Sequence, residues 1–264
     1  MCFKKLLFVI SLTSLLIMVC SCKSAIKNDA DSSTNVASEE ESSLNIENAK
    51  KSVDVKIDSV DISDIEGDKT YQTIRYSVLT CSDNNTLQDL LDDLNASMKN
   101  DAESFANQNK SEIREFLKEH PDMPEAEYTH TSDISVQRND GKYLSLTEFV
   151  YENMMGAHGM YVELGHVYDV QNGKKLELTD FINDKQELAT FLKKWVSDHN
   201  DEYGAFDYAN DTIDAYVKGE YDLEFYLTSE LIVVFQPYDI APYAAGLIEI
   251  KVDDDLLKVR INDI

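Results

Sequence analysis

Residues 128–170 read YTHTSDISVQRNDGKYLSLTEFVYENMMGAHGMYVELGHVYDV, and this stretch decides the fold class. Along its last third, apolar residues such as Val162, Leu164 and Tyr168 alternate with other residues, which is the two-residue period of a strand. We predict three strands here, which cover 128–138, 142–152 and 161–170. A link at 155–159 joins the last two. Three successive strands with no helix between them argue against a regular alternation of strands and helices.

A long helix is predicted before these strands. From Leu87 to Leu117, apolar residues recur at spacings of three and four, as on the buried face of an amphipathic helix. The polar stretch 107–109 predicts a weak point in this helix. His120-Pro121 predicts its end, because proline disfavours helical backbone in the residue before it. Two further strands are predicted before the helix, at 53–62 and 70–81.

A hairpin, then helices, then strands are predicted after residue 170. The segment 171–174, Gln-Asn-Gly-Lys, predicts a tight turn, because Asn-Gly tolerates positive φ at both central positions. Three helices should follow: a short one that begins at Thr179 or Asp180, one at 185–198 and one at 209–217. The last three strands are predicted at 222–227, 230–236 and 246–252. The fold class is therefore α+β, with two small subdomains, at 51–152 and 153–264, in which antiparallel sheets are each packed with helices.

The N-terminal residues predict export. Lys4 and Lys5 precede an apolar run over 6–19, which is too short to be a comfortable membrane span. Cys22 follows with an aliphatic residue three positions before it and a small residue directly before it, as in bacterial lipoprotein signals. Cys20 fits this pattern poorly. An ordinary secretory signal or an uncleaved N-terminal anchor is the alternative.

On the lipoprotein interpretation, residues 1–21 are a signal peptide and Cys22 carries the lipid that binds the membrane. Residues 22–50 are rich in Ser, Asn, Asp and Glu and have no sustained apolar period, so we expect a disordered tether before the folded part. The expected location is extracytoplasmic and membrane-anchored, at the cell surface or in the periplasm.

The charge of the chain limits its partners. The formal net charge is −26, from 24 basic and 50 acidic residues. Such a surface repels nucleic acid and anionic lipid headgroups and attracts cationic partners, although solubility alone is an equal explanation. Once Cys2, Cys20 and Cys22 are assigned to the signal and the lipid, Cys81 is the last cysteine, so we expect no intramolecular disulfide. Cys81 follows an apolar run and is interpreted as a small core residue.

Motifs for catalysis are missing from the sequence. It contains no phosphate loop, dinucleotide fingerprint, zinc-binding helix motif or nucleophile elbow, so we predict no catalytic residue, metal or cofactor. His166 lies on an apolar strand face and is expected to be a hydrogen-bonded core residue. His158 lies between Gly156-Ala157 and Gly159 in the link between two strands. It could contact a ligand or act as an acid or base, or it could simply bond to the neighbouring backbone.

Three passages resemble a known family. They are NMMGAHGMY (153–161), YDVQNGKKLELTDFI (168–182) and FYLTSELIVVFQPYDIAPYAAG (225–246). Together they resemble the RsiV/PdaC-type extracellular domain family, over about 153–260; residues 52–150 resemble the domain that usually precedes it in pattern only. The family includes a lysozyme-binding anti-sigma factor ectodomain and the accessory domain of a peptidoglycan deacetylase. Because only Met1–Lys5 precede the apolar run, we expect no anti-sigma segment.

The resemblance and the loop residues together suggest a binding edge. We expect the link at 155–160 and the loop at 237–245 to form it. The candidate ligand-binding residues are Gly156, His158, Gly159, Tyr238, Pro242 and Tyr243. The predicted function is an exported cell-envelope lipoprotein with a non-catalytic binding module, for a basic protein such as lysozyme or for peptidoglycan. An envelope hydrolase or deacetylase that uses His158 is the alternative, and the motifs could also mark only a fold.

Overall fold

The computed structural model describes residues 52–220, 222–259 and 261. The predicted signal peptide, the lipidated Cys22 and the tether at 22–50 therefore lie outside the described residues. All described residues belong to one compact unit.

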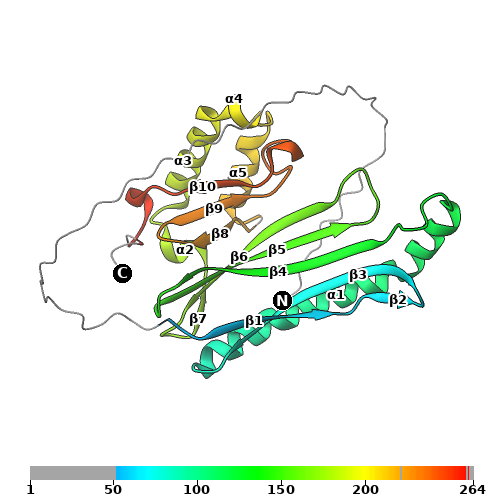
Figure 1. The fold of residues 1–264 in the computed structure, drawn as a ribbon. Coiled ribbons are helices and arrows are strands. Elements are labelled where there is room, and N and C mark those ends of the chain that lie inside the picture. The colour runs from blue at the N-terminus through cyan, green and yellow to red at the C-terminus, as the bar shows by residue number, and fades with distance from the viewer. Residues whose placement is uncertain (1–51, 221, 260, 262–264) are drawn as a thin grey trace, which may run out of the picture. The chain divides into compact units, whose positions relative to one another are not determined.

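Seven strands form the larger sheet (Figure 1). Their order is β1-β3-β4-β5-β6-β7, and β2 also pairs with β3. Their bounds are β1 Val55–Asp61, β2 Asp64–Glu66, β3 Lys69–Cys81, β4 Tyr128–Asn139, β5 Tyr143–Asn153, β6 Met160–Asp169 and β7 Lys174–Leu176. Every neighbouring pair is antiparallel except β3 and β4, which run parallel. The reason is that helix α1, Asn85–Glu119, carries the chain back along the sheet between these two strands.

Helix α1 runs alongside β3 (Figure 1). It begins after Asn84, whose side chain accepts a hydrogen bond from the backbone N–H of Leu87 at 3.0 Å. The weak point predicted at 107–109 was wrong, because the helix is continuous. Buried residues on both sides of that stretch, Phe105 and Ile113, hold it against the sheet. The predicted end before Pro121 is confirmed.

Three strands form the smaller sheet, in the order β10-β9-β8. The bounds are β8 Glu224–Leu227, β9 Leu231–Phe235 and β10 Ile248–Lys251. The apolar run of β9 suits its central place, because four of its five residues are buried and both of its faces are therefore largely covered. The accompanying helices are α2 Leu178–Phe181, α3 Lys185–Asp198, α4 Asn200–Tyr203 and α5 Ala209–Lys218. Figure 1 shows α3, α4 and α5 gathered beside this sheet.

Two hydrophobic cores result, and strands β5 and β6 contribute to both. Leu144 and Leu146 of β5 face the core under α1. Tyr143 of β5 and Val167 of β6 face the core formed with the smaller sheet and its helices. This alternation follows from the two-residue period of a strand. The middle of the larger sheet is therefore packed on both faces.

The two sheets meet closely at Gly165 in β6. A methyl carbon added to Gly165 would lie 1.7 Å from the backbone carbonyl oxygen of Phe225 in β8. The backbone N–H of Gly165 donates to the carboxylate of Glu224 at 2.8 Å. Arg138 at the end of β4 adds a second connection, since its guanidinium donates to the carbonyls of Thr228 and Ile261 at 2.9 and 3.2 Å.

The hairpin between β6 and β7 is confirmed. Gly173 has a φ of 57°, but Asn172 does not share the positive φ that was expected of it. The Asn172 side chain and backbone N–H donate instead to the carboxylate of Asp169, at 2.7 and 2.9 Å. These bonds hold Asn172 in an ordinary conformation, as is common for an aspartate that starts a turn.

The α+β class, with two sheets packed against helices, is confirmed. The boundary at 152/153 falls at the end of β5, which pairs with β6 in the same sheet, and the independence of the two subdomains stays a prediction. Cys81 is a buried free thiol, and His166 is a buried core residue. Within the described ranges, none of the helices combines the length and the hydrophobicity that a membrane crossing requires.

Candidate functional site

The link between β5 and β6 lies against the loop that follows β9. The hydroxyl of Tyr243 donates to the carbonyl oxygen of Gly159 at 2.7 Å. The ring of His158 stacks on that of Tyr243, with 3.9 Å between centroids. The Tyr238 hydroxyl lies 3.3 Å from Nε2 of His158. Four of the six candidate residues are therefore in direct contact although about 80 positions separate the two segments.

The other two candidates lie in the same segments but take no part in those contacts. Gly156 is exposed, and a methyl carbon added to it would meet only the carbonyl oxygen of His158 at 3.9 Å. Pro242 is exposed and directly precedes a short 3-10 helix, Tyr243–Ala245.

Three aromatic residues of the β5–β6 hairpin extend this group, and the sequence analysis missed them. Tyr161 packs edge-on against Tyr243, with centroids 5.5 Å apart, and Phe149 stacks on Tyr161 at 5.4 Å. Tyr151 lies over Gly159, where an added methyl carbon would be 2.4 Å from the tyrosine ring. We call these six residues the aromatic cluster: Phe149, Tyr151, His158, Tyr161, Tyr238 and Tyr243. The pairing of β5 with β6 would have revealed these residues, because it places Tyr151 directly opposite Tyr161 on the same face of the sheet.

The backbone at Tyr238 is strained. Its φ is 73°, a left-handed conformation that costs a residue with a side chain about 1–2 kcal/mol. It follows Pro237 in a turn, in which the N–H of Asp239 donates to the carbonyl of Gln236 at 3.0 Å. Glycine or asparagine is the usual residue at such a position of a turn. A tyrosine there, 44% exposed, is a backbone outlier of the kind that clusters at functional sites.

The residues of this cluster fall in the regions where two family models match the chain. The model described as "Deacetylase PdaC" matches residues 65–161, and the model described as "Protein of unknown function (DUF3298)" matches residues 179–255. The chain matches the PdaC/DUF3298-type domain family. Four members of the cluster lie in the PdaC match, and Tyr238 and Tyr243 lie in the DUF3298 match.

Solved structures of DUF3298 family members share the fold. One from Bacteroides fragilis NCTC 9343 is 18% identical, with a TM-score of 0.55 over 80% of this chain and 96% of that one. Another, from Pseudomonas aeruginosa PAO1, is 17% identical, with a TM-score of 0.53 over 81% of this chain and 98% of that one. No curated protein matches the sequence. The predicted family resemblance is confirmed.

Both ring nitrogens of His158 are engaged in polar contacts. Nδ1 lies 2.9 Å from the carbonyl oxygen of Gly159, which can only accept, so Nδ1 carries a proton. In the neutral ring Nε2 then accepts from the hydroxyl of Tyr238. Partial burial raises the pKa of the Tyr243 phenol above its ordinary value, with Tyr161, Tyr151 and Tyr238 adding to the effect. Tyr243 therefore stays a neutral hydrogen-bond donor.

Acidic residues lie next to the aromatic cluster. Glu163 of β6 is the cross-strand partner of Phe149. Burial, with a smaller contribution from Glu249, raises the pKa of its carboxyl. Glu249 in turn accepts a hydrogen bond from the hydroxyl of Tyr226 at 2.7 Å. The cluster thus combines exposed rings with carboxylates at one side.

A second polar group lies buried on the other face of β5. The Glu148 carboxylate accepts from Ser132 Oγ at 2.7 Å and lies 3.0 Å from Nε2 of His166. Because the serine bonds to the glutamate and not to the histidine, this is not the order in which a histidine activates a serine. Within the described ranges, no three His, Cys, Asp or Glu side chains converge as a metal site. The group stabilises the interior of the sheet.

Proposed function

We propose that this chain is an exported cell-envelope lipoprotein, anchored through Cys22, whose folded part binds a basic protein such as lysozyme. The aromatic cluster is the proposed contact surface. The observation that carries the proposal is the strained backbone of the exposed Tyr238, because strain of this kind persists where the rest of the structure compensates for it and function uses it.

The chemistry of the cluster supports a protein partner. Tyrosine is enriched at interface hot spots, where rings and arginine side chains pack together at the centre of the contact. Cations are also attracted to the faces of aromatic rings. The net charge of −26 favours encounter with a basic surface. Resemblance to a family with a lysozyme-binding member suggests lysozyme as the first partner to test.

The alternative, a hydrolase or deacetylase that uses His158, has less support. The partners of the His158 ring are a backbone carbonyl and a tyrosine hydroxyl. Catalytic histidines are usually oriented by a third group such as a carboxylate. The contacts of His158 position the rings of Tyr238 and Tyr243, which suits a binding surface better than a base.

The test is a titration of the full-length chain, in mild detergent, with hen-type lysozyme and separately with purified peptidoglycan, at low and moderate salt. We expect saturable lysozyme binding that persists at moderate salt, with an association rate that falls as salt rises, because steering by exposed charges is screened. If the chain binds peptidoglycan and not lysozyme, its partner is cell-wall glycan instead of a basic protein. Binding to neither would contradict the proposal.

A further inference from the structure

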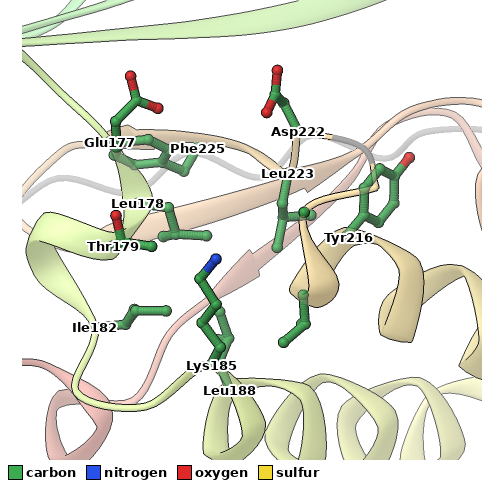
Figure 2. Close-up of a pocket in the computed structure, with 12 residues that line it drawn as sticks. Glu177, Leu178, Thr179, Ile182, Lys185, Leu188, Tyr216, Asp222, Leu223 and Phe225 are labelled. Carbon is green, nitrogen blue, oxygen red and sulfur yellow. The ribbon is translucent and has the colours of Figure 1, made fainter.

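A pocket of about 230 Å³ lies away from the aromatic cluster, between α2, α3, α5 and the start of β8 (Figure 2). None of the residues that line it belongs to the aromatic cluster, so a ligand bound in this pocket would be independent of the proposed lysozyme binding. Sites for drug-sized ligands usually enclose about 300–1,000 Å³. This pocket therefore suits a smaller group, of the size of one amino acid.

The floor of the pocket is apolar and fixed. Ile182, Leu188 and Phe225 are buried members of the hydrophobic core and form its base. Leu178, Val217 and Leu223 are partly buried and pack against the same core. A short aliphatic or aromatic side chain placed here would lose its contact with water, which favours binding by about 25 cal/mol per Å² of buried surface.

Charged groups of both signs surround this apolar floor. In Figure 2 the ammonium of Lys185 points toward the space between Leu178 and Leu223. The carboxylates of Glu177 and Asp222 also border the pocket, and in Figure 2 they stand apart from each other, Glu177 beyond Leu178 and Asp222 beyond Leu223. An anionic group and a cationic group of one small ligand would each find an opposite charge here.

Lys185 differs from the other lysines of α3. Lys193 is paired with Asp214, and Lys194 with Asp198. In the part of the chain that the structure describes, Lys185 forms no such ion pair. An unpaired ammonium directed over an apolar floor is available to a carboxylate of the ligand.

We propose that this pocket binds an α-amino acid with an apolar side chain. Lys185 binds the carboxylate and the apolar floor takes the side chain, and when the ligand is a free amino acid, Glu177 or Asp222 receives its ammonium. The same chemistry of carboxylate and apolar side chain is offered by a free amino acid and by the C-terminal residue of a peptide, and the ammonium distinguishes the two.

The test is a titration of the full-length chain, methyl-labelled and in mild detergent, with leucine, N-acetyl-leucine and leucine amide, followed by NMR. We expect leucine to bind saturably, with a Kd on the order of 0.1–1 mM. The methyl signals of Leu178, Leu188, Val217 and Leu223 should shift together. If N-acetyl-leucine binds about tenfold more weakly, the ligand is a free amino acid; if it binds equally, the ligand is the C-terminus of a peptide.

The matched variants are Lys185→Met and Lys194→Met, both exposed lysines of the same helix. Lys185→Met should weaken leucine binding at least about tenfold, which corresponds to 1.4 kcal/mol, while Lys194→Met should leave it unchanged. The proposal is overturned if leucine amide binds as well as leucine, if Lys185→Met binds normally, or if these methyl signals do not shift up to about 10 mM leucine.

Discussion

Replacing Gly165 with alanine tests how the two sheets fit together. The added methyl carbon would lie 1.7 Å from the carbonyl oxygen of Phe225 and 2.6 Å from its carbonyl carbon. Carbon atoms in favourable contact lie about 3.5–4.0 Å apart, so one of the two strands would have to move by more than about 1 Å. Phe225 cannot give way like the end of a side chain, because its backbone belongs to β8, which is paired with β9.

The expected cost follows from this rigidity. Overpacking that side chains can relieve costs about 1–3 kcal/mol, and here backbone must move, so we expect at least about 3 kcal/mol. For a domain of this size that corresponds to a loss of about 6–12 °C in melting temperature.

Urea denaturation followed by circular dichroism measures the effect, with Gly156→Ala as the matched control. The carbon added at Gly156 has open space, so the free energy of unfolding of that variant should stay within about 0.5 kcal/mol of the wild type. If Gly165→Ala also stays within about 1 kcal/mol, then β6 and β8 do not meet as described, and the reasoning is refuted.

Three further changes have defined outcomes. Burial raises the pKa of the Glu224 carboxyl to about 7 in the folded protein, from an ordinary value of about 4.5. The folded state therefore binds the proton more tightly than the unfolded state does. The resulting stabilisation is fully present below about pH 4.5 and is lost as the pH rises through about 7. Glu224→Gln should therefore raise the free energy of unfolding at about pH 8 by up to about 3 kcal/mol, and an unchanged pH profile in urea titrations would contradict this. Tyr238→Gly should be about 1 kcal/mol more stable than Tyr238→Ala, because only glycine adopts positive φ without cost; equal melting curves would show that the strain is absent. Arg138→Met removes two hydrogen bonds to the carbonyls of Thr228 and Ile261 and one to the carboxylate of Asp140, and denaturation should show a loss of at least about 2 kcal/mol. A loss under about 0.5 kcal/mol would argue against that connection.

Much of the fold could be predicted because apolar residues recur along its helices and strands with the period of each type of element. The helix at 185–198 has the predicted bounds, and the alternation in 161–170 places β6 within one residue at each end. Helix α1 ends just before Pro121, because the proline ring disfavours helical backbone in the residue that precedes it. Local sequence carries this information, since these signals depend on residues only a few positions apart.

Long-range features were beyond the sequence alone. The parallel pairing of β3 with β4 depends on where α1 packs, and no local pattern records that. The close approach at Gly165 depends on a strand about 60 residues away. The loop residues His158 and Tyr238 could be singled out, but Phe149 and Tyr161 could not, because their contacts appear only once the strand register is known.

The measurement that tests the central claim most directly compares lysozyme binding by Tyr238→Ala and Tyr208→Ala in the full-length chain. The two tyrosines are similarly exposed, at 44% and 49%, but Tyr208 stacks on Phe206 outside the aromatic cluster. If the cluster is the binding surface, Tyr238→Ala should raise the Kd about 30-fold, as expected for a hot-spot loss of about 2 kcal/mol, and Tyr208→Ala should leave it unchanged. Equal Kd values for both variants and the wild type would contradict the assignment of binding to this cluster.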